Sequence, residues 1–293
     1  QAAQVSRLHP RHSRNSVFTA SASMASRTPA AAAFAAAASC RSLVLCWLAL
    51  CLHGVDSEPA APAKIQHMPA YIRIQFVRKV YSILSVQLAL NVIVGALMYC
   101  NIPFEKVQNY TGGAMFASLF SLALLVSVLL CCKNSLKTFP TNFVILFAFT
   151  LAESYAVGFA CLMYTLPSVM LAVVTTCAVF FCLTAYACFS KKDFTGFGPY
   201  LHAALWCMIC YATIMCVWGW FAPVPSAMEL LYSFFGVVVF SFYIVFDTQR
   251  IVEGEHKSFS FEVDDYCLAA LTLYLDILNL FLHVLKLLGK RRH

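Results

Sequence analysis

The stretch TLYLDILNLFLHVLKLL, residues 272–288, decides how the rest of the chain is interpreted. Thirteen of its seventeen residues, counting Thr272 and Tyr274, suit a lipid or dry protein environment. The exceptions are Asp276, Asn279 and His283, with Lys286 near the end. Separations of three and four residues place these side chains on one face of an α-helix. We therefore expect an apolar helix with a polar stripe, and an aspartate near its middle needs an explanation.

The composition of the whole chain agrees with this environment. Of 293 residues, 61% are hydrophobic and 11% are charged, against about 25% charged in a soluble domain. Apolar runs of about twenty residues, enough for an α-helix to cross the hydrocarbon core, alternate with short polar stretches. Continuously apolar runs also argue against a β-barrel. We predict an all-α polytopic membrane protein with seven transmembrane helices, at 80–100, 114–132, 142–164, 167–189, 199–221, 228–251 and 265–288.

The basic residues predict the orientation of these spans. Lys and Arg are concentrated before the first span and in the loops after spans two, four and six. Short loops rich in Lys and Arg face the cytosol, so we expect a cytosolic N-terminus. The tail Lys290-Arg291-Arg292 conflicts with this rule, because seven spans place it on the opposite side. Either the tail breaks the rule or the last helix crosses incompletely, and we expect seven full spans.

The first 63 residues differ from the membrane domain expected at 64–293. Residues 1–55 contain five basic residues and no acid, with many Ser and Ala. This composition is typical of a targeting segment, while a chain that starts with Gln1 and has Met24 inside it also fits a start site assigned too early. The net charge of +7 comes mainly from this segment and the loops. Basic residues do not interleave with aromatic ones, so we expect no nucleic-acid partner.

The chain has 14 cysteines, which invites a metal or redox interpretation. The C-x-x-C pair Cys207 and Cys210 lies inside a predicted span and has no second cluster beside it. Structural zinc sites need paired clusters with ligand spacing. We therefore expect these thiols to act as small apolar side chains and expect no bound cofactor.

Three acids lie inside predicted spans, namely Glu153, Asp247 and Asp276. A charge at mid-membrane costs on the order of 3 kcal/mol, so such groups face the bundle interior or water. Asp276 belongs to a stripe along the last span, with intervals of seven, four, three and four residues between Asp265, Thr272, Asp276, Asn279 and His283. This stripe is a candidate wall for an ion path.

Asp247 lies one turn before the end of span six, and the short loop that follows makes spans six and seven neighbours. We therefore expect Asp247 and Asp276 to meet at a similar depth, with no Lys or Arg in the central part of any span to neutralise them. Two adjacent carboxylates in a low dielectric cannot both ionise easily, so the pair takes up a proton as a unit. When both are ionised they form a hard oxygen site suited to transient Ca²⁺ binding.

Four motifs in order carry a resemblance to a known family. They are the stretches IRIQFVRKVYSILSVQL at 72–88, TLAESY at 150–155, FDTQ at 246–249, and DDY at 264–266 followed by LYLDILNLF at 273–281. Together they resemble the Lifeguard branch of the transmembrane Bax inhibitor motif-containing family over about residues 68–288. The resemblance implies seven helices with the last one central, a pH-sensitive Ca²⁺ leak from endoplasmic reticulum or Golgi stores, and suppression of cell death.

The resemblance also implies roles for individual residues. Asp247 and Asp276 match the paired aspartates that sense pH and gate the path. Asp264 and Asp276 match acidic positions implicated in conduction, and Glu153 matches an acid of span three in the Lifeguard branch. Some members latch the aspartates with an arginine in helix two, but residues 114–132 contain none. The predicted partners are the lipid bilayer, Ca²⁺ and protons, together with cell-death regulatory proteins.

Two other functions compete with the leak channel. Intramembrane aspartyl proteases also carry aspartates on helices six and seven, but their second aspartate follows Gly-x-Gly, whereas Leu273-Tyr274-Leu275 precedes Asp276 here. A seven-helix receptor or scaffold for death regulators is the third interpretation, and the short loops leave little surface for it. We therefore predict a channel and no enzyme, with Asp264, Asp265, Thr272, Asn279, His283 and Glu153 along the ion path.

Overall fold

The computed structural model describes residues 69–107, 139–190, 192–222, 224–252 and 265–292, with isolated positions between 110 and 123. Its long helices are α3 (Ala70–Asn101), α5 (Thr141–Leu162), α6 (Leu166–Phe189), α7 (Gly198–Phe221), α8 (Ser226–Val252) and α9 (Tyr266–Leu288). Short 3₁₀ turns, η2 (Phe104–Lys106) and η4 (Thr195–Phe197), follow α3 and precede α7. Segment 1–63, most of the predicted span 114–132, and Asp264 lie outside the described residues.

Six of these helices are long and apolar enough to cross a membrane, which confirms an all-helical membrane protein within the described ranges. The predicted spans agree with their bounds to within a few residues, except that α3 begins at Ala70 rather than at residue 80. The extra turns carry Arg73, Arg78 and Lys79. A hydropathy criterion leaves these charged residues outside a span. Arg and Lys nevertheless have a high helix propensity, so the helix continues through them.

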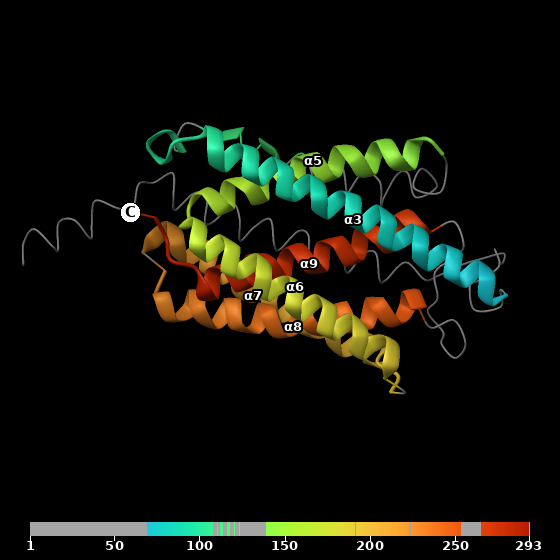
Figure 1. Ribbon diagram of the computed structural model, residues 1–293. Helices are drawn as coiled ribbons and strands as arrows, with labels where there is room; N and C mark the ends of the chain where they lie inside the picture. Colours follow the sequence, from blue (N-terminus) through green and yellow to red (C-terminus); the bar gives the residue numbers. More distant parts are fainter. Residues whose placement is uncertain are drawn as a thin grey trace, which may run out of the picture.

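Three helices run in the same direction, namely α3, α5 and α9. The Gln87 Nε2 donates to Thr150 Oγ1 at 3.0 Å, with a sequence separation of 63 residues, and Gly95 lies against Gly158 at the same separation. The Asn91 Nδ2 donates to the Tyr274 hydroxyl at 2.7 Å and joins α3 to α9. Parallel α3 and α5 therefore begin together at one end of the bundle (Figure 1).

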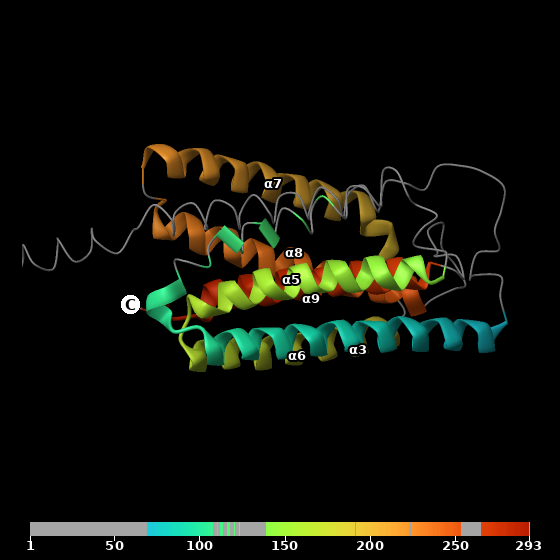
Figure 2. The ribbon, with the colours of Figure 1, turned by 90° about the horizontal axis from the view of Figure 1, so that it is seen from above.

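The helix α9 lies against α3, α5, α6 and α8, and 89% of its most apolar stretch is buried, the largest share among the six helices. Figures 1 and 2 show α3 and α5 along one side of it and α8 along another, running the opposite way. With 23 residues, α9 is about 35 Å long, which exceeds the ~30 Å of a hydrocarbon core. Its length therefore favours a complete crossing.

The residues after α9 fold back onto the turn between α5 and α6. The Arg292 amide donates to the Met163 carbonyl and the Thr165 amide donates to the Lys290 carbonyl, both at 3.0 Å. The Lys290 amide also donates to Ser168 Oγ at 2.9 Å. We call residues 290–292 in this position the tail clasp, and the end of the bundle that holds it the tail end.

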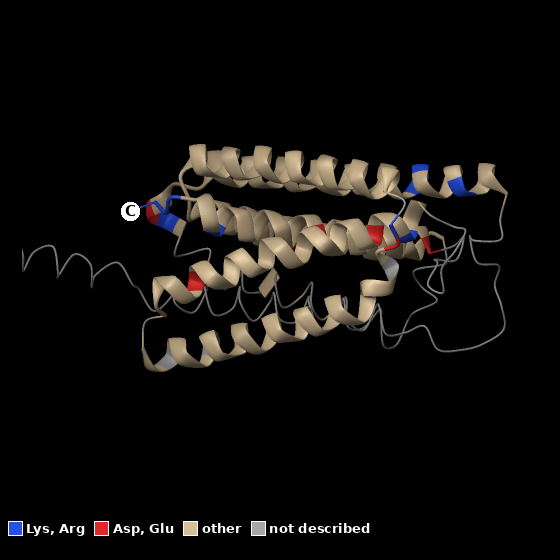
Figure 3. Ribbon diagram, turned by 90° about the horizontal axis from the view of Figure 1, so that it is seen from below, with Lys and Arg blue, Asp and Glu red and all other residues tan. Residues whose placement is uncertain are grey.

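The charges of the tail clasp are matched by its surroundings. Arg291 Nη2 lies 3.2 Å from Glu229 Oε2 at the start of α8. The Arg292 guanidinium lies over the rings of Tyr99 and Phe104, 5.3 and 5.0 Å from their centroids. Figure 3 shows the described Lys and Arg side chains gathered at the two ends of the bundle. The basic tail that conflicts with the charge rule is thus held by an acid and two aromatic rings.

Candidate functional site

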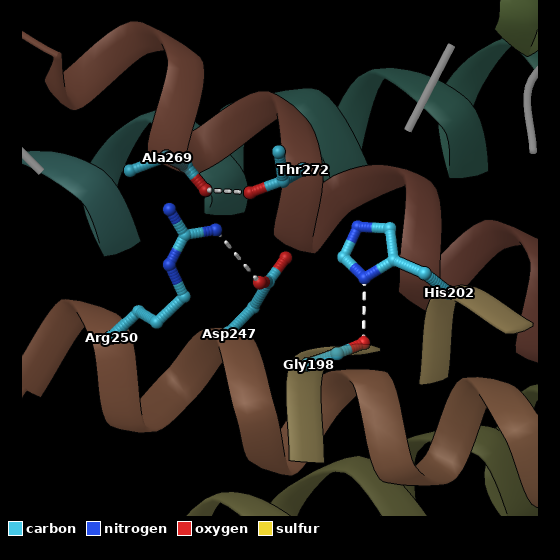
Figure 4. Close-up of polar contacts among 6 residues, drawn as sticks. All are labelled: Gly198, His202, Asp247, Arg250, Ala269 and Thr272. Carbon is cyan, nitrogen blue, oxygen red and sulfur yellow. Dashed lines mark hydrogen bonds and ion pairs between the residues drawn. The ribbon is translucent and has the colours of Figure 1, made fainter. Parts of the chain in front are cut away.

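Two carboxylates from adjacent helices meet in the interior. Asp247 of α8 is fully buried and Asp276 of α9 is 5% exposed. The two carboxyl groups lie close enough to influence each other electrostatically, and Thr272 lies beside Asp247 (Figure 4). The short link between α8 and α9 brings them side by side in opposite directions, which matches the sequence prediction for this pair. A buried pair of carboxyls is well suited to share a proton.

Arg250 is a partner of Asp247 that the sequence analysis missed. Its Nη1 lies 3.7 Å from Asp247 Oδ1, and the two side chains are 7% and 1% exposed (Figure 4). The guanidinium also lies over the Phe246 ring, 5.6 Å from its centroid. The expectation of an un-neutralised pair is therefore wrong, because it considered only the central part of each span and Arg250 lies at the end of span 228–251. The spacing of three residues, which places both side chains on one helix face, was the available signal.

His202 of α7 is the second residue that sequence reasoning left out of the site. Its Nδ1 bonds to the Gly198 carbonyl oxygen at 2.6 Å, within the first turn of α7. The ring lies beside Asp247 in Figure 4. The polar centre around Asp247 therefore draws on α7, α8 and α9.

Gln249 anchors the end of α8 next to this centre. It is fully buried, donates from Nε2 to the Lys192 carbonyl at 2.9 Å, and accepts from the Phe194 amide at 2.8 Å. The Gln249 side-chain amide thereby provides hydrogen-bond partners for two backbone groups of the connection between α6 and α7. The motif at 246–249 thus ties together α8, α9 and the start of α7.

The remaining stripe residues of α9 are buried along the same helix. Thr272 and Asn279 are each 5% exposed and His283 is 2% exposed. Thr272 Oγ1 donates to the Ala269 carbonyl at 3.1 Å (Figure 4), and Asn279 Nδ2 donates to the Leu275 carbonyl at 2.9 Å. His283 lies against Phe240 and Tyr232 of α8. We call this contact, from Asp247 and Asp276 to His283, the polar seam between α8 and α9.

Two predicted path residues stand apart from the polar seam. Asp265 is the half-buried residue directly before α9. Glu153 is fully buried on α5, which meets α9 through Phe149 and Tyr274, whose rings are 6.4 Å apart. Tyr274 is two residues before Asp276, or roughly 200° around the helix. Glu153 therefore belongs to the opposite side of α9, near the buried Gln87 and Asn91 that the sequence analysis did not single out.

Metal ligands do not cluster in the part of the chain that the structure describes. No group of three or more His, Cys, Asp or Glu side chains is arranged there to hold an ion. Cys207 and Cys210 are exposed free thiols on α7, a helix whose outward face is apolar. The described thiols therefore offer no structural zinc site.

Comparison with known proteins identifies the group to which this architecture belongs. Residues 73–293 match the family model described as "Inhibitor of apoptosis-promoting Bax1". The chain belongs to the Bax inhibitor family. The mouse protein lifeguard 4 is 38% identical over 219 residues, which cover 74% of this chain and 86% of that protein. The resemblance to the Lifeguard branch is confirmed.

Other members of the Bax inhibitor family show how far the similarity extends. Bax inhibitor 1 of Schizosaccharomyces pombe is 32% identical, covering 74% of this chain and 77% of its own length. The Golgi anti-apoptotic protein of vaccinia virus strain Lister is 34% identical, with 74% and 86% covered. These relatives are named as inhibitors of apoptosis rather than as enzymes. The matched region includes every described element of the polar seam.

Proposed function

We propose that this chain is a pH-regulated Ca²⁺ leak channel of an intracellular membrane, with Asp247 and Asp276 as its proton switch. The observation that carries the proposal is the meeting of two buried carboxyls from α8 and α9 in an apolar bundle. Intramembrane acids are costly and mark ion or proton pathways. Protonated, the pair shares a hydrogen bond and holds the two helices together. Ionised, it repels, and offers oxygen ligands to a passing cation.

The proposed path runs along the polar seam. Asp264 and Asp265 attract cations at its entrance, Thr272 provides an oxygen atom beside the carboxyl pair, Asn279 provides one beyond it, and His283 ends the path. Glu153 acts on the other side of α9, through the packing of α5. Ca²⁺ and protons are the transported species, and the chain needs no resident cofactor.

The proposal includes seven spans with α9 at their centre and a cytosolic N-terminus. Parallel α3 and α5 support the odd number of crossings, because Asn101 lies at the tail end whereas Thr141 lies at the other end. The concentration of basic loop residues supports the orientation. The name of the vaccinia relative favours the Golgi, and the endoplasmic reticulum is the alternative membrane.

An anti-apoptotic role follows if the leak lowers the Ca²⁺ content of the store. The family description and the names of the relatives support this part of the proposal. A scaffold that binds cell-death regulators accounts for the same names without ion flux. A protease is less well supported, because Leu273-Tyr274-Leu275 precedes Asp276 where those enzymes carry Gly-x-Gly.

The deciding experiment measures Ca²⁺ flux from liposomes that contain the full chain, across about pH 5–8, a range that strongly shifted carboxyls in proteins can reach. Asparagine mimics a protonated aspartate, so we expect Asp247→Asn and Asp276→Asn to show, at every pH, the flux that wild type shows at the acidic end. Glu229→Gln, an acid outside the polar seam, should keep the wild-type pH dependence.

Either of two results would contradict the proposal. Folded, inserted wild-type protein that passes no Ca²⁺ at any pH would favour the scaffold. A pH-dependent flux that survives unchanged in both asparagine variants would keep the channel but remove the proton switch from this pair.

A further inference from the structure

The far end of the polar seam is closed by an imidazole. The His283 ring stacks on Phe240 with centroids 5.6 Å apart, and makes a T-shaped contact with Tyr232 with centroids 5.1 Å apart. Tyr232, Gly236 and Phe240 are spaced four residues apart, so they form one row on the face of α8. The ring of His283 lies between the two aromatic members of this row.

Gly236 is the member of the row that makes this position possible. A Cβ atom at residue 236 would overlap the Cε1, Nδ1 and Cδ2 atoms of His283, which are part of a rigid ring. The backbone of Gly236 has no left-handed conformation, so its glycine is explained by close approach rather than by φ. We call the space above residue 236 the glycine notch.

The surroundings of the ring are tightly packed. Tyr211 of α7 stacks on Tyr232 with centroids 5.9 Å apart and planes inclined by 4°. The Lys286 ammonium, one turn further along α9, lies 5.6 Å from the Tyr232 centroid. His283 Nδ1 is buried and has no hydrogen-bond partner among the described residues. A polar atom without a partner inside an aromatic layer is costly, which points to a role other than stability.

We infer that Gly236 is a positioning residue that seats the His283 imidazole across the polar seam, and that the seated ring is the constriction at the tail end of the path. The part concerning the constriction rests on the proposed leak function. The seating of the ring rests on the packing alone. Removal of the imidazole therefore widens the path without touching Asp247 or Asp276.

The test is a cycle of four full-length proteins: wild type, Gly236→Ala, His283→Ala and the double variant. In detergent, we expect Gly236→Ala to lower the thermal stability of the wild type but not that of the His283→Ala background, where the notch is empty. His283→Ser provides a second background if the alanine variant folds poorly. Gly219→Ala is the matched control, because among the described residues its Cβ would meet Val224 alone, at an ordinary contact distance of 3.7 Å.

The same proteins are then compared for Ca²⁺ flux in liposomes at one fixed pH. We expect a several-fold higher flux from His283→Ala and from the double variant. An equal loss of stability from Gly236→Ala in both backgrounds would overturn the seating. If the stabilities show coupling between residues 236 and 283 but His283→Ala has the wild-type Ca²⁺ flux, the ring is seated as inferred but is not the constriction. The proposed leak function would remain intact. A wild type that passes no Ca²⁺ would refute the constriction and the proposed function together, and the stability cycle would still decide the seating.

Discussion

The buried carboxyl of Asp247 has a neighbouring cation on its own helix. Arg250 and Asp247 are one turn apart, both buried, and the guanidinium is covered by the Phe246 ring. Both members of this ion pair belong to α8, so the pair by itself does not join α8 to another helix.

This geometry predicts the effect of removing the cation. Arg250→Leu removes the cation that contacts the buried Asp247, so we expect a loss of about 3 kcal/mol or more in unfolding free energy. The double variant Asp247→Asn/Arg250→Leu should recover most of this loss, because both charges of the pair are then absent. Thermal or denaturant unfolding in detergent measures both. Arg291→Leu, from the exposed pair with Glu229, serves as control and should cost no more than about 1 kcal/mol.

At the scale of elements, the contact between α3 and α5 depends on two glycines of unequal importance. A Cβ on Gly158 would lie 2.7 Å from Met98 Sδ and 3.3 Å from the Gly95 Cα. A Cβ on Gly95 would meet only the Gly158 Cα, at 4.0 Å. The two helices therefore approach most closely where Gly158 faces Gly95, as small residues allow in membrane bundles.

The asymmetry predicts opposite outcomes for one kind of substitution. Gly158→Ala should cost about 1–3 kcal/mol through overpacking. Gly95→Ala should be neutral or slightly stabilising, since alanine has the higher helix propensity by about 1 kcal/mol. Unfolding midpoints in the same detergent compare the two. Equal destabilisation by both variants would show that the helices are not in this register.

At the scale of the whole molecule, the tail clasp joins elements that are distant in sequence. Residues 290–292 bond to the turn after α5, pair with the start of α8, and cover aromatic rings at the end of α3. Burial raises the pKa of the Tyr164 hydroxyl, while the nearby Arg291 opposes the increase. The clasp therefore couples α3, α5, α8 and α9 at the tail end.

Deletion of residues 290–292 should loosen the packing at the tail end of the bundle without unfolding the opposite end. Cys161 is buried near the turn that the clasp covers, and Cys267 is buried at the opposite end of the bundle. In single-cysteine backgrounds, we expect the deletion to raise the rate at which a small maleimide modifies Cys161 several-fold. The rate at Cys267 should stay constant. A similar increase at both thiols would indicate global loosening and contradict the clasp.

Much of this architecture follows from hydropathy alone, since runs of about twenty apolar residues leave few alternatives to membrane helices. The meeting of Asp247 and Asp276 also followed from chain order, because a short loop makes neighbours of α8 and α9. Arg250 escaped prediction because the sequence looks the same whether a basic residue at the end of a span lies in a loop or pairs with a buried acid. His202 and Gly236 escaped because their importance depends on which helix lies opposite, which a single sequence does not encode locally.

The polar seam also constrains how the molecule enters the membrane. The aspartate, asparagine and histidine of α9 face α8, so α9 alone would expose all of them to lipid. Asp247 and Arg250 impose the same penalty on an isolated α8. Each helix covers the other's polar face, so the two are expected to leave the translocon as one hairpin. A substitution that disrupts the polar face of α8 should therefore be detected first as failed membrane insertion of α9, before any change in Ca²⁺ flux can be measured.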